Sequence, residues 1–257
     1  MSYYEGYNKN EEETIYGRIS SMYRDEGAKI LIQRSVQFLL IYLYRLLINN
    51  YFYIDGKKIK YFTNTYNAVN SERIVEIPFV LSLLHTFPQN KRILEIGNVL
   101  NHYAHFEHTV VDKYEKFSGV LNLDIVDFDT NEKFDLIISI STIEHIGFDE
   151  EPITPGKSLL AIKKIIALLK PGGMLLITVP LAYNPEIDKI LRDNIIPFKE
   201  KYFLKRVNFF NRWEESSLGE CINLKYGKRF PAANAVALLI YEYTVSKDTL
   251  TELELVR

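Results

Sequence analysis

The sequence has a single cysteine, Cys221, so the chain cannot form an internal disulfide bond. It also has no excess of basic residues, because 31 lysines and arginines stand against 33 acidic residues and the formal net charge is −2. Proteins that bind phosphate backbones present a basic stripe, so we expect no nucleic-acid partner. The start of the chain lacks a charged segment followed by an apolar core and a cleavage site, and the cytoplasm is therefore the expected location.

The chain also lacks an uninterrupted apolar run long enough to cross a membrane. Its most apolar segment, residues 27–50, predicts a long helix, but Arg34 and Arg45 interrupt it. The uncharged stretch between these arginines is about half of the roughly 20 residues that a membrane span needs. We expect no transmembrane helix here. The apolar face predicts a helix that covers the catalytic domain, with peripheral membrane contact or a homodimer contact as alternatives.

Two regions differ in their patterns. Residues 1–70 predict an N-terminal arm, the long apolar helix and a β-hairpin, in which Asp55 and Gly56 suit a two-residue turn. Residues 71–257 predict one catalytic domain, and a segment of this length can bury a sizeable core. The chain is therefore expected to consist of one domain with an N-terminal extension.

A helix is expected to open the second region. It begins near Glu72 and Arg73, carries Glu76 one turn later, and contains Pro78, which predicts a kink or an interruption. These charged side chains either line the mouth of a pocket or form a solvated helical face. The sequence leaves both readings open.

From residue 92 onward, strand-like and helix-like segments alternate, which is typical of a mostly parallel sheet covered on both faces. The predicted strands are residues 93–97, 109–112, 119–124, 134–140 and 174–180, with two more near 202–209 and 235–243. A helix over residues 157–170 precedes Pro171-Gly172-Gly173, which predicts the end of that helix and a turn. The expected fold class is α/β, with a doubly wound, mostly parallel sheet of the seven-stranded type.

The first of these strands ends in an acid-x-Gly turn. Glu95 and Gly97 place a carboxylate and a backbone without Cβ at a strand's carboxyl end, where nucleoside cofactors dock in open α/β sheets. A dinucleotide fingerprint needs two further glycines, and residues 98–100 contain none. Only about fifteen residues separate Gly97 from Asp112, so the connecting helix must be very short. The turn therefore favours a nucleoside cofactor without phosphate groups.

In this order, the segments resemble the class I S-adenosylmethionine-dependent methyltransferases over residues 93–180. In that family an acid-x-Gly turn ends the first strand, an acid ends the second, an aspartate follows the third, and Lys-Pro-Gly-Gly precedes the fifth. The matching positions are Glu95, Gly97, Asp112, Asp124 and Lys170 to Gly173. The segment Phe134 to Ile137, with Glu144-His145-Ile146 behind it, resembles the fourth strand and its loop. The turn Gly97-Asn98-Val99-Leu100-Asn101-His102-Tyr103 resembles a variant branch associated with small-molecule or surface-sugar modification.

The resemblance implies a Rossmann-like fold, S-adenosylmethionine as cofactor and S-adenosylhomocysteine as product. It implies that Asp112 accepts hydrogen bonds from both ribose hydroxyls and that Asp124 accepts one from the adenine amine. Glu95 is expected to orient the turn or the cofactor's ammonium group. Ser139 and Ile140 are expected to reach the sulfonium through their carbonyls, or else only to pack in the sheet. The expected cofactor-binding residues are Glu95, Gly97, Asn98, Asp112, Lys113, Asp124, Ile125, Ser139 and Ile140.

Methyl transfer needs mainly that two reactants are held in line at near-attack distance. A hydroxyl acceptor must also lose a proton, and histidine side chains titrate near neutral pH, which makes His145 the expected base. Glu144 is expected to orient its imidazole, and the alternative is a structural histidine. Tyr183, Asn184 and Arg212 are expected to contact the acceptor, because the segment after the fifth strand normally roofs the substrate.

Three histidines recur at a spacing of three residues, at His102, His105 and His108. No cysteine accompanies them, and we expect no bound metal, although a metal site is the alternative reading.

The predicted function is S-adenosylmethionine-dependent methylation, with O-methylation of a small polar acceptor such as a sugar or glycan intermediate. One alternative is a methyltransferase-like partner subunit that binds the cofactor weakly or not at all. The other is a nicotinamide-dependent oxidoreductase, against which the missing glycines count.

Overall fold

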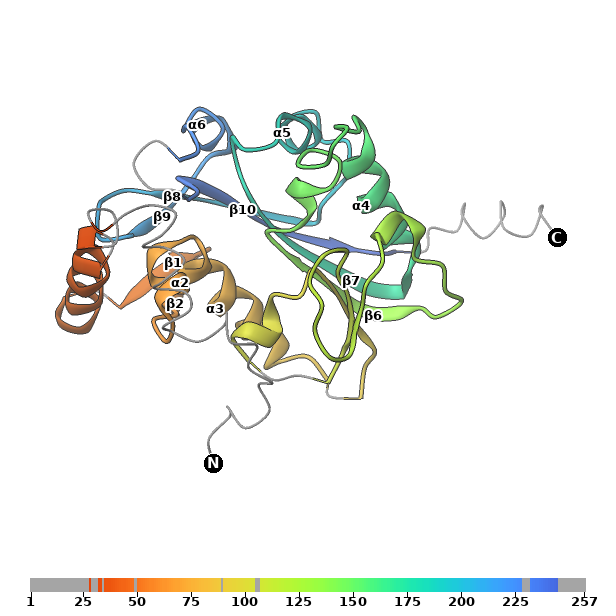
Figure 1. Cartoon of the computed structure of the whole chain (residues 1–257), viewed down its shortest axis with the longest axis horizontal. Coiled ribbons are helices and arrows are strands. Elements are labelled where there is room, and N and C mark those ends of the chain that lie inside the picture. Colours follow the sequence, from red (N-terminus) through yellow and green to blue (C-terminus); the bar gives the residue numbers. More distant parts are fainter. Residues whose placement is uncertain are drawn as a thin grey trace.

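Helices cover both faces of a central eight-stranded sheet in the computed structural model of the chain (Figure 1). The structure describes residues 28, 32–33, 35–48, 50–88, 90–104, 107–227 and 232–244. The order of the strands across the sheet is β5-β4-β3-β6-β7-β10-β8-β9. These strands are β3 (Ile93–Ile96), β4 (Thr109–Val111), β5 (Val120–Leu121), β6 (Phe134–Ile140), β7 (Leu169–Pro180), β8 (Glu200–Arg206), β9 (Trp213–Ser216) and β10 (Ala235–Glu242).

The helices beside the sheet lie in two layers. Helix α3 packs against one face, and α4 and α5 pack against the other (Figure 1). The α-helices are α2 (Tyr66–Asn70), α3 (Arg73–Leu84), α4 (Lys157–Ala167), α5 (Pro185–Arg192) and α6 (Leu218–Cys221). The 3-10 helices are η2 (Leu100–His102), η3 (Ile125–Asp127) and η4 (Ile143–His145).

A separate hairpin of β1 (Tyr51–Ile54) and β2 (Lys57–Lys60) packs on the α3 side of the sheet. Its two turn residues, Asp55 and Gly56, both have positive φ, as a two-residue hairpin turn requires. The predicted hairpin is confirmed.

The strand order reverses between β3 and β6. From β3 the parallel pairings lead through β4 to β5 in one direction, and from β6 to β7 in the other. Strand β10 runs antiparallel to both β7 and β8. Such a reversal leaves a crevice beyond the carboxyl ends of the two strands. The predicted doubly wound α/β class is confirmed, and β9 adds an edge strand to the expected seven.

Side chains of the central strands alternate between two hydrophobic cores. On β10, residues 235, 237 and 239 pack under α4 and α5, whereas residues 236, 238 and 240 pack under α3. Because helices cover both faces, these strands are buried on both sides. This explains why they read in the sequence as continuous apolar runs.

The structure differs from two local predictions, the interruption at Pro78, for which a kink was the alternative, and the turn at Pro171-Gly172-Gly173. Helix α3 continues through Pro78 without interruption, because Ile74, Ile77 and other residues on both sides of the proline are buried and this packing holds the helix. The expected turn at Pro171-Gly172-Gly173 lies inside β7, and α4 already ends at Ala167. Gly172 has a φ of +76° and donates its N–H to the Tyr243 carbonyl at 2.8 Å, so the glycines let the strand pair irregularly instead of ending a helix.

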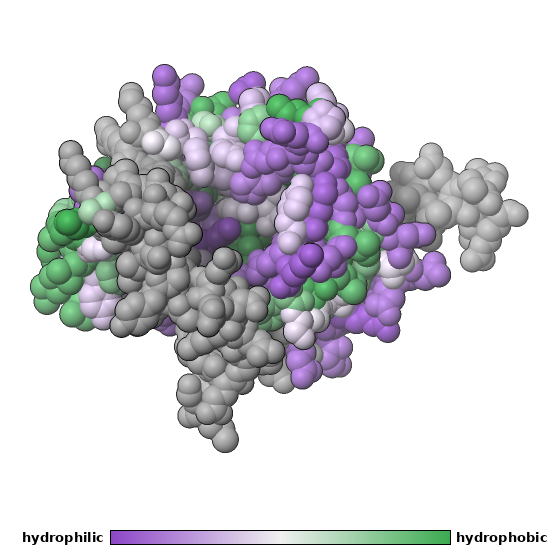
Figure 2. Space-filling view, viewed as in Figure 1, coloured by the Kyte–Doolittle hydropathy of each residue, from purple (hydrophilic) through white to green (hydrophobic). Residues whose placement is uncertain are grey.

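Residues 35–47 are helical, within the helix predicted for residues 27–50. Arg45 ties this helix to the connection between β8 and β9 and to the residue after β2: it is 2% exposed, donates from Nη2 to the Phe210 carbonyl at 2.9 Å, and lies over the Tyr61 ring at 3.6 Å. The outer surface of the helix is apolar, and residues 46–48 are at least 67% exposed (Figure 2). Buried side chains such as Ile41 and Arg45 therefore hold this helix against the rest of the protein.

No helix in the described part of the chain is both long enough and apolar enough to span a membrane. The expected arm before residue 28 lies outside the described residues. The division of the chain at residue 70 and the homodimer contact stay predictions.

Candidate active site

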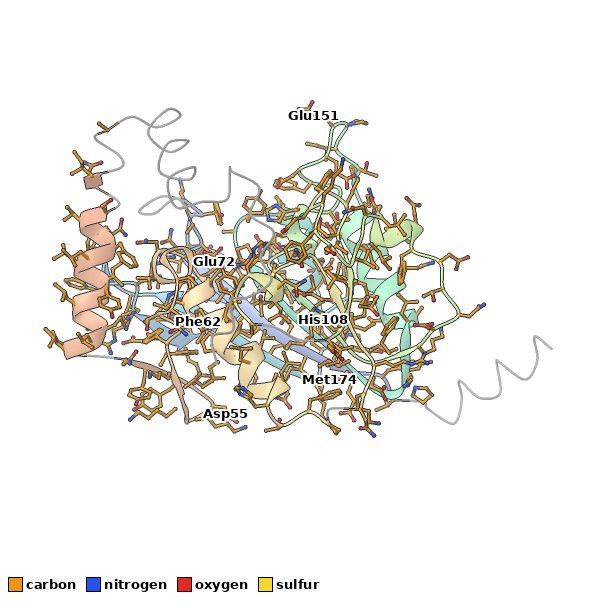
Figure 3. The ribbon with its side chains drawn as sticks, turned by 60° about the horizontal axis from the view of Figure 1, so that its bottom comes forward. Asp55, Phe62, Glu72, His108, Glu151 and Met174 are labelled. Atoms are coloured by element: carbon orange, nitrogen blue, oxygen red, sulfur yellow. The ribbon has the colours of Figure 1, made fainter. Side chains whose placement is uncertain are left out.

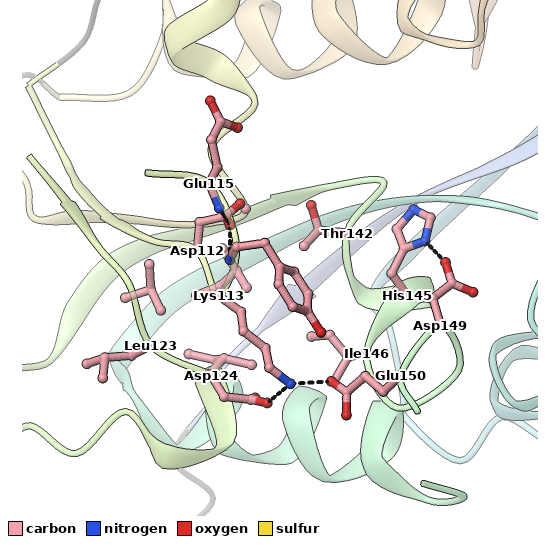
Figure 4. A pocket seen from close by; sticks show the side chains of 15 residues that line it. Asp112, Lys113, Glu115, Leu123, Asp124, Thr142, His145, Ile146, Asp149 and Glu150 are labelled. Atoms are coloured by element: carbon pink, nitrogen blue, oxygen red, sulfur yellow. Dashed lines mark hydrogen bonds and ion pairs between the residues drawn. The ribbon is translucent and has the colours of Figure 1, made fainter. Parts of the chain in front are cut away.

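A pocket of about 430 Å³ lies beyond the carboxyl ends of β3, β4 and β6, where the strand order reverses (Figure 4). Each of the neighbouring strands supplies part of its wall through the turn that follows it. The lining residues are Ile96, Gly97, Val111, Asp112, Lys113, Tyr114, Glu115, Leu123, Asp124, Ile125, Thr142, His145, Ile146, Asp149 and Glu150.

Gly97 lies against the side chain of Thr142 at the pocket wall. Its φ is +86°, and a Cβ at this position would lie 2.8 Å from Cγ2 of Thr142. Its N–H donates to the carbonyl of Val111 at 2.9 Å. Only glycine fits a position that combines a left-handed backbone with a neighbour this close.

Glu95 does not line the pocket but is fully buried beneath the turn. Its Oε1 accepts hydrogen bonds from the N–H groups of Val99 at 3.0 Å and Leu100 at 2.7 Å. Its Oε2 lies 2.7 Å from Nε2 of His108, which is also buried. Of the two roles expected for Glu95, the structure places it in the first, that of orienting the turn.

Asn98, like Glu95, is buried behind the residues that line the pocket. It is 2% exposed, its N–H donates to Oδ2 of Asp112 at 3.0 Å, and its Nδ2 donates to Oε1 of Glu115 at 2.9 Å. The turn after β3 is thereby bonded to the two carboxylates that follow β4.

Asp112 lies in the pocket wall at the end of β4. Its Oδ1 accepts from the N–H groups of Tyr114 at 2.8 Å and Glu115 at 2.7 Å, while its Oδ2 accepts from Asn98. A carboxylate has about four acceptor positions, so one position on Oδ2 is left for a ligand. Asp112 can therefore accept one hydroxyl in this geometry, and not the expected two.

Asp124 is held by two lysines. Its Oδ2 lies 2.6 Å from Nζ of Lys157 and 3.0 Å from Nζ of Lys113, and both lysines also pair with Glu150. Burial acts to raise the pKa of the Asp124 carboxyl, but these ion pairs keep that pKa below its usual value. Its Oδ1 accepts from the N–H of Val126 at 3.2 Å, so a further ligand bond to Asp124 has to share Oδ1.

Ser139 and Ile140 are not among the residues that line the pocket, which agrees with the alternative that they pack in the sheet. Both are fully buried in the sheet, and Ser139 donates from Oγ to the carbonyl of Ile96 at 3.3 Å. The Ile140 carbonyl accepts from Oγ1 of Thr142 at 3.1 Å. Thr142, two residues beyond the strand, is the residue of this segment that lines the pocket.

His145 stands at the pocket wall with its side chain about half exposed. Its Nδ1 is bonded to the carboxylate of Asp149 (Figure 4), which also accepts a hydrogen bond from the Tyr183 hydroxyl at 2.5 Å. Burial acts to raise the pKa of Asp149, but the bonds from Tyr183 and His145 hold that pKa below its usual value. Because Asp149 occupies Nδ1, Nε2 is the ring nitrogen left to exchange a proton with a ligand.

Tyr183 does not line the pocket itself. It reaches the site through Asp149, and its ring lies against His145 with 5.2 Å between the centroids. Tyr183 therefore lies next to His145, the predicted base, and not in the pocket lining where an acceptor contact was expected.

Glu144 is fully buried and lies outside the pocket lining. One of its carboxylate oxygens is 3.5 Å from Nε2 of His145, and neither oxygen has a hydrogen-bond partner among the described residues. Burial, together with the nearby charges of Glu76 and Glu72, raises the pKa of the Glu144 carboxyl well above its usual value.

Two of the residues that were expected to contact the acceptor, Asn184 and Arg212, lie outside the pocket lining. Asn184 is 2% exposed, donates from Nδ2 to the Glu144 carbonyl at 2.7 Å, and caps α5 by accepting from the N–H of Glu186. Arg212 lies in the connection between β8 and β9, paired with Glu214 at 2.6 Å, and is not part of the pocket. Asn184 therefore supports the loop of Glu144, and the prediction for Arg212 is wrong because that connection folds against the N-terminal helix.

The histidines considered as metal ligands bind carboxylates instead. His102 pairs with Glu115 at 2.8 Å and His108 with Glu95, while His105 lies outside the described residues. In the described ranges, no group of three or more His, Cys, Asp or Glu side chains is arranged to hold a metal ion.

Several pocket residues were not expected from the sequence. They are Ile96, Val111, Tyr114, Glu115, Leu123, Thr142, Ile146, Asp149 and Glu150. Two had a usable signal: Glu115 follows Asp112 by three residues and Asp149 follows His145 by four, spacings at which side chains of one turn meet.

The residues present fit a nucleoside without phosphate groups. The volume lies within the range of small-molecule sites, and Ile96, Val111 and Ile125 give it apolar walls. Five of its lining side chains are carboxylates, against one lysine: Asp112, Glu115, Asp124, Asp149 and Glu150. In the described part of the connection after β3, the one helical segment is the three-residue η2, which is shorter than the helices whose N-termini bind the phosphates of dinucleotides.

Comparison with known proteins gives one family. The family model described as "Methyltransferase domain" matches residues 71–223. None of the curated proteins matches the chain.

Solved structures of methyltransferases are similar to the chain at low identity. The N-methyltransferase NodS from Bradyrhizobium japonicum WM9 is 16% identical, over 68% of this chain and 97% of its own, with a TM-score of 0.43. A possible histamine N-methyltransferase from Thermotoga maritima is 16% identical, over 66% and 89%, with a TM-score of 0.41. An rRNA methylase from Streptococcus thermophilus is 16% identical, over 66% and 97%, with a TM-score of 0.40. With TM-scores below 0.5, these likenesses add nothing to the family match.

The close approach at Gly97 predicts a large cost for a side chain there. We expect Gly97→Ala to lower the free energy of unfolding by about 3 kcal/mol or more, because it adds a clash with Thr142 to the backbone strain. Gly119→Ala is the matched control: Gly119 has nearly the same φ, +85°, but open space around it, and strain alone costs about 1 kcal/mol. Denaturant unfolding of both variants measures the difference, and equal losses would contradict the role of the contact.

The raised pKa of Glu144 predicts a dependence of stability on pH. The folded protein keeps the proton on Glu144 at pH values where the unfolded chain has lost it, so this group's stabilising contribution falls as pH rises above about 4.5. Glu144→Gln removes that loss. Thermal melts should show the variant gaining on the wild type with rising pH, by up to about 1.4 kcal/mol per pH unit. Glu132→Gln, at a carboxylate that is 58% exposed, should show no trend, and a flat difference for Glu144→Gln would refute the shift.

Proposed function

The chain belongs to the methyltransferase-domain family, and from this premise we propose that it transfers the methyl group of S-adenosylmethionine to a hydroxyl of a small polar acceptor, such as a sugar or glycan intermediate. The observation that carries the choice of a hydroxyl is the position of His145. A basic ring nitrogen stands at the wall of the pocket, with its other nitrogen bonded to Asp149. Such a pair is suited to accept the proton that a hydroxyl must lose.

The pocket residues divide the binding of the cofactor among them. The open position on Oδ2 of Asp112 accepts a ribose hydroxyl, and Glu115 beside it offers a second carboxylate. Leu123 and Ile125 enclose the adenine ring, near Oδ1 of Asp124. The carboxylate lining favours a ligand that carries a positive charge and no phosphate.

When bound, S-adenosylmethionine supplies an electrophilic methyl group on a positively charged sulfur, which keeps the bonding electron pair as the methyl leaves. His145 orients the acceptor hydroxyl through Nε2 and takes its proton as the new carbon–oxygen bond forms. Asp149 stabilises the resulting imidazolium, and Tyr183 keeps Asp149 in place by donating to it. Gly97 and Thr142 leave room for the reacting groups to align.

Two further points belong to this proposal. A nicotinamide cofactor is disfavoured, because its pyrophosphate would meet a carboxylate lining instead of a helix N-terminus. The reaction is placed in the cytoplasm, with no nucleic-acid partner, in line with the composition of the chain.

Cofactor binding tests the first half of the proposal. Calorimetry should show that the protein binds S-adenosylmethionine and S-adenosylhomocysteine but not NAD. Asp112→Asn should weaken binding of S-adenosylhomocysteine about tenfold to a hundredfold, because an amide nitrogen can accept neither the ribose hydroxyl nor the N–H of Asn98. Asp127→Asn is the control, at an exposed aspartate outside the pocket. Unchanged affinity in the Asp112 variant would remove the residue from the cofactor site.

Turnover tests the second half. With labelled S-adenosylmethionine and an acceptor identified from a panel of sugars and nucleotide sugars, His145→Gln should lower kcat by about a hundredfold to ten-thousandfold. Affinity for S-adenosylhomocysteine should stay within about twofold of the wild type, because the change removes a proton acceptor and not a cofactor contact. A variant that keeps its turnover would make His145 a structural residue, and loss of cofactor binding with turnover would point to a folding defect.

A further inference from the structure

The helix of residues 35–47 exposes a continuous apolar stripe outside the pocket. It lies at one edge of the molecule, and side chains on its far side point away from the rest of the protein (Figure 3). The outer face of this helix consists of six aliphatic side chains whose exposed fractions run from 41% to 76%: Val36, Leu39, Leu40, Leu43, Leu46 and Leu47. Monomeric proteins rarely leave so many large apolar side chains together in water, so the outer face indicates contact with a partner.

The opposite side of the helix is fixed against the protein. Ile41 and Arg45 are at most 2% exposed, and Arg45 donates to the Phe210 carbonyl at 2.9 Å. The ring of Tyr44 stacks on that of Phe210, with 4.6 Å between the centroids and 13° between the planes. Rotation of the helix would break these contacts, so the outer face cannot be buried by turning it inward.

The apolar positions of the outer face recur at intervals of three and four residues, from Val36 through Leu39 and Leu43 to Leu46. This is the spacing by which one helix packs its side chains into the spaces between those of another. At the rise of an α-helix the stripe is roughly 15–20 Å long. A second copy of the chain offers a helix with the same length and the same spacing.

The charge of the outer face also favours a second copy. Arg45 is the one charged residue among residues 35–48, and it is buried. Two copies of this neutral face can therefore meet without bringing like charges together. Helices that lie on membranes carry Lys and Arg beside their apolar face, and this face carries neither.

The exposed area is close to what a dimer needs. Tyr42 and Ile48, at 41% and 74% exposure, extend the outer face. Side chains of this size expose on the order of 150–200 Å² when fully accessible, so the extended face offers roughly 600–800 Å². A stable interface buries about 800 Å² on each partner. Contact between two such faces therefore supplies most of a standard interface.

We propose that the protein forms a homodimer, in which the outer faces of two copies of this helix pack against each other about a two-fold axis. Leu43 is near the middle of the face. It therefore meets the partner's Leu43 whether the two helices run parallel or antiparallel.

The dimer contact is separate from the pocket. The helix is held by the connection between β8 and β9, whereas the pocket lies beyond β3, β4 and β6 in the other half of the sheet. The proposal is therefore independent of the reaction, and a variant that loses the contact should keep its fold and its cofactor affinity.

Size-exclusion chromatography with light scattering tests the proposal on the full chain. The wild type at micromolar concentration should have twice the 30.0 kDa mass of one chain. Leu43→Glu should raise the dissociation constant of the dimer at least about a hundredfold, because it buries two like charges against each other. Leu160→Glu is the matched control, since Leu160 lies on α4 with 55% exposure, and it should remain a dimer. Circular dichroism should show the same helix content in all three proteins.

A mixing experiment tests the arrangement of the two copies. Leu43→Lys alone should also run as a single chain, and an equal mixture of Leu43→Glu and Leu43→Lys chains should regain the mass of a dimer. Opposite charges at the same position then pair across the two-fold axis. A mixture that stays monomeric would contradict the meeting of the two Leu43 positions.

Flotation with vesicles tests the competing occupant. Lys57, Lys58 and Lys60 are exposed on β2, the next strand but one, and make an anionic membrane the alternative to examine. The wild type should stay in solution with vesicles of phosphatidylcholine mixed with phosphatidylserine. The proposal is overturned if the wild type is a monomer, if Leu43→Glu remains a dimer, or if the wild type floats with the vesicles and Leu43→Glu does not.

Discussion

The near-contact between Gly97 and Thr142 is the constraint on which the pocket depends. It brings the ends of β3 and β6 together at the point where the strand order reverses, and only a residue without Cβ allows it. Glu95 holds the turn by accepting hydrogen bonds from the N–H groups of Val99 and Leu100. The N–H of Asn98, in the same turn, donates to Asp112 and so fixes the position of that carboxylate. Carboxylates and backbone amides thus do here what a glycine-rich loop and a helix N-terminus do in dinucleotide sites.

The acidic residues of the pocket wall differ in their pairing from Glu144, which is buried behind that wall. Asp124 and Glu150 share Lys113 and Lys157, and their pKa values are kept low, so that wall is a fixed set of ion pairs. Glu144 has no such partner, and its pKa is raised. The difference lies in the partners: two lysines pair with Asp124 and Glu150, whereas burial dominates at Glu144.

The sequence was sufficient to predict the fold class, the hairpin and every strand from β3 to β8 as well as β10, because strands buried on both faces leave continuous apolar runs. Four of the residues that it singled out, Gly97, Asp112, Asp124 and His145, line the pocket, because each lies in a segment that follows a strand of the sheet. Contacts between distant segments could not be predicted in the same way. The ion pair of Lys113 with Glu150, and the folding of the Arg212 connection against the N-terminal helix, depend on how loops return to the sheet, which no local spacing encodes. Pro78 and the glycines of β7 show the same limit, since packing and pairing override the local preference for a break.

Strand β10 is the last strand along the described part of the chain, yet it lies between β7 and β8 in the interior of the sheet. A ribosome that synthesises this protein has released β7, β8 and β9 before the strand that joins them exists. Until then one edge of β7 is unpaired, and β8 and β9 form a separate antiparallel ribbon whose β8 edge is unpaired. Such edges invite pairing with other chains. The sheet can therefore be completed only after β10 has been made, which gives molecular chaperones a defined interval in which to act.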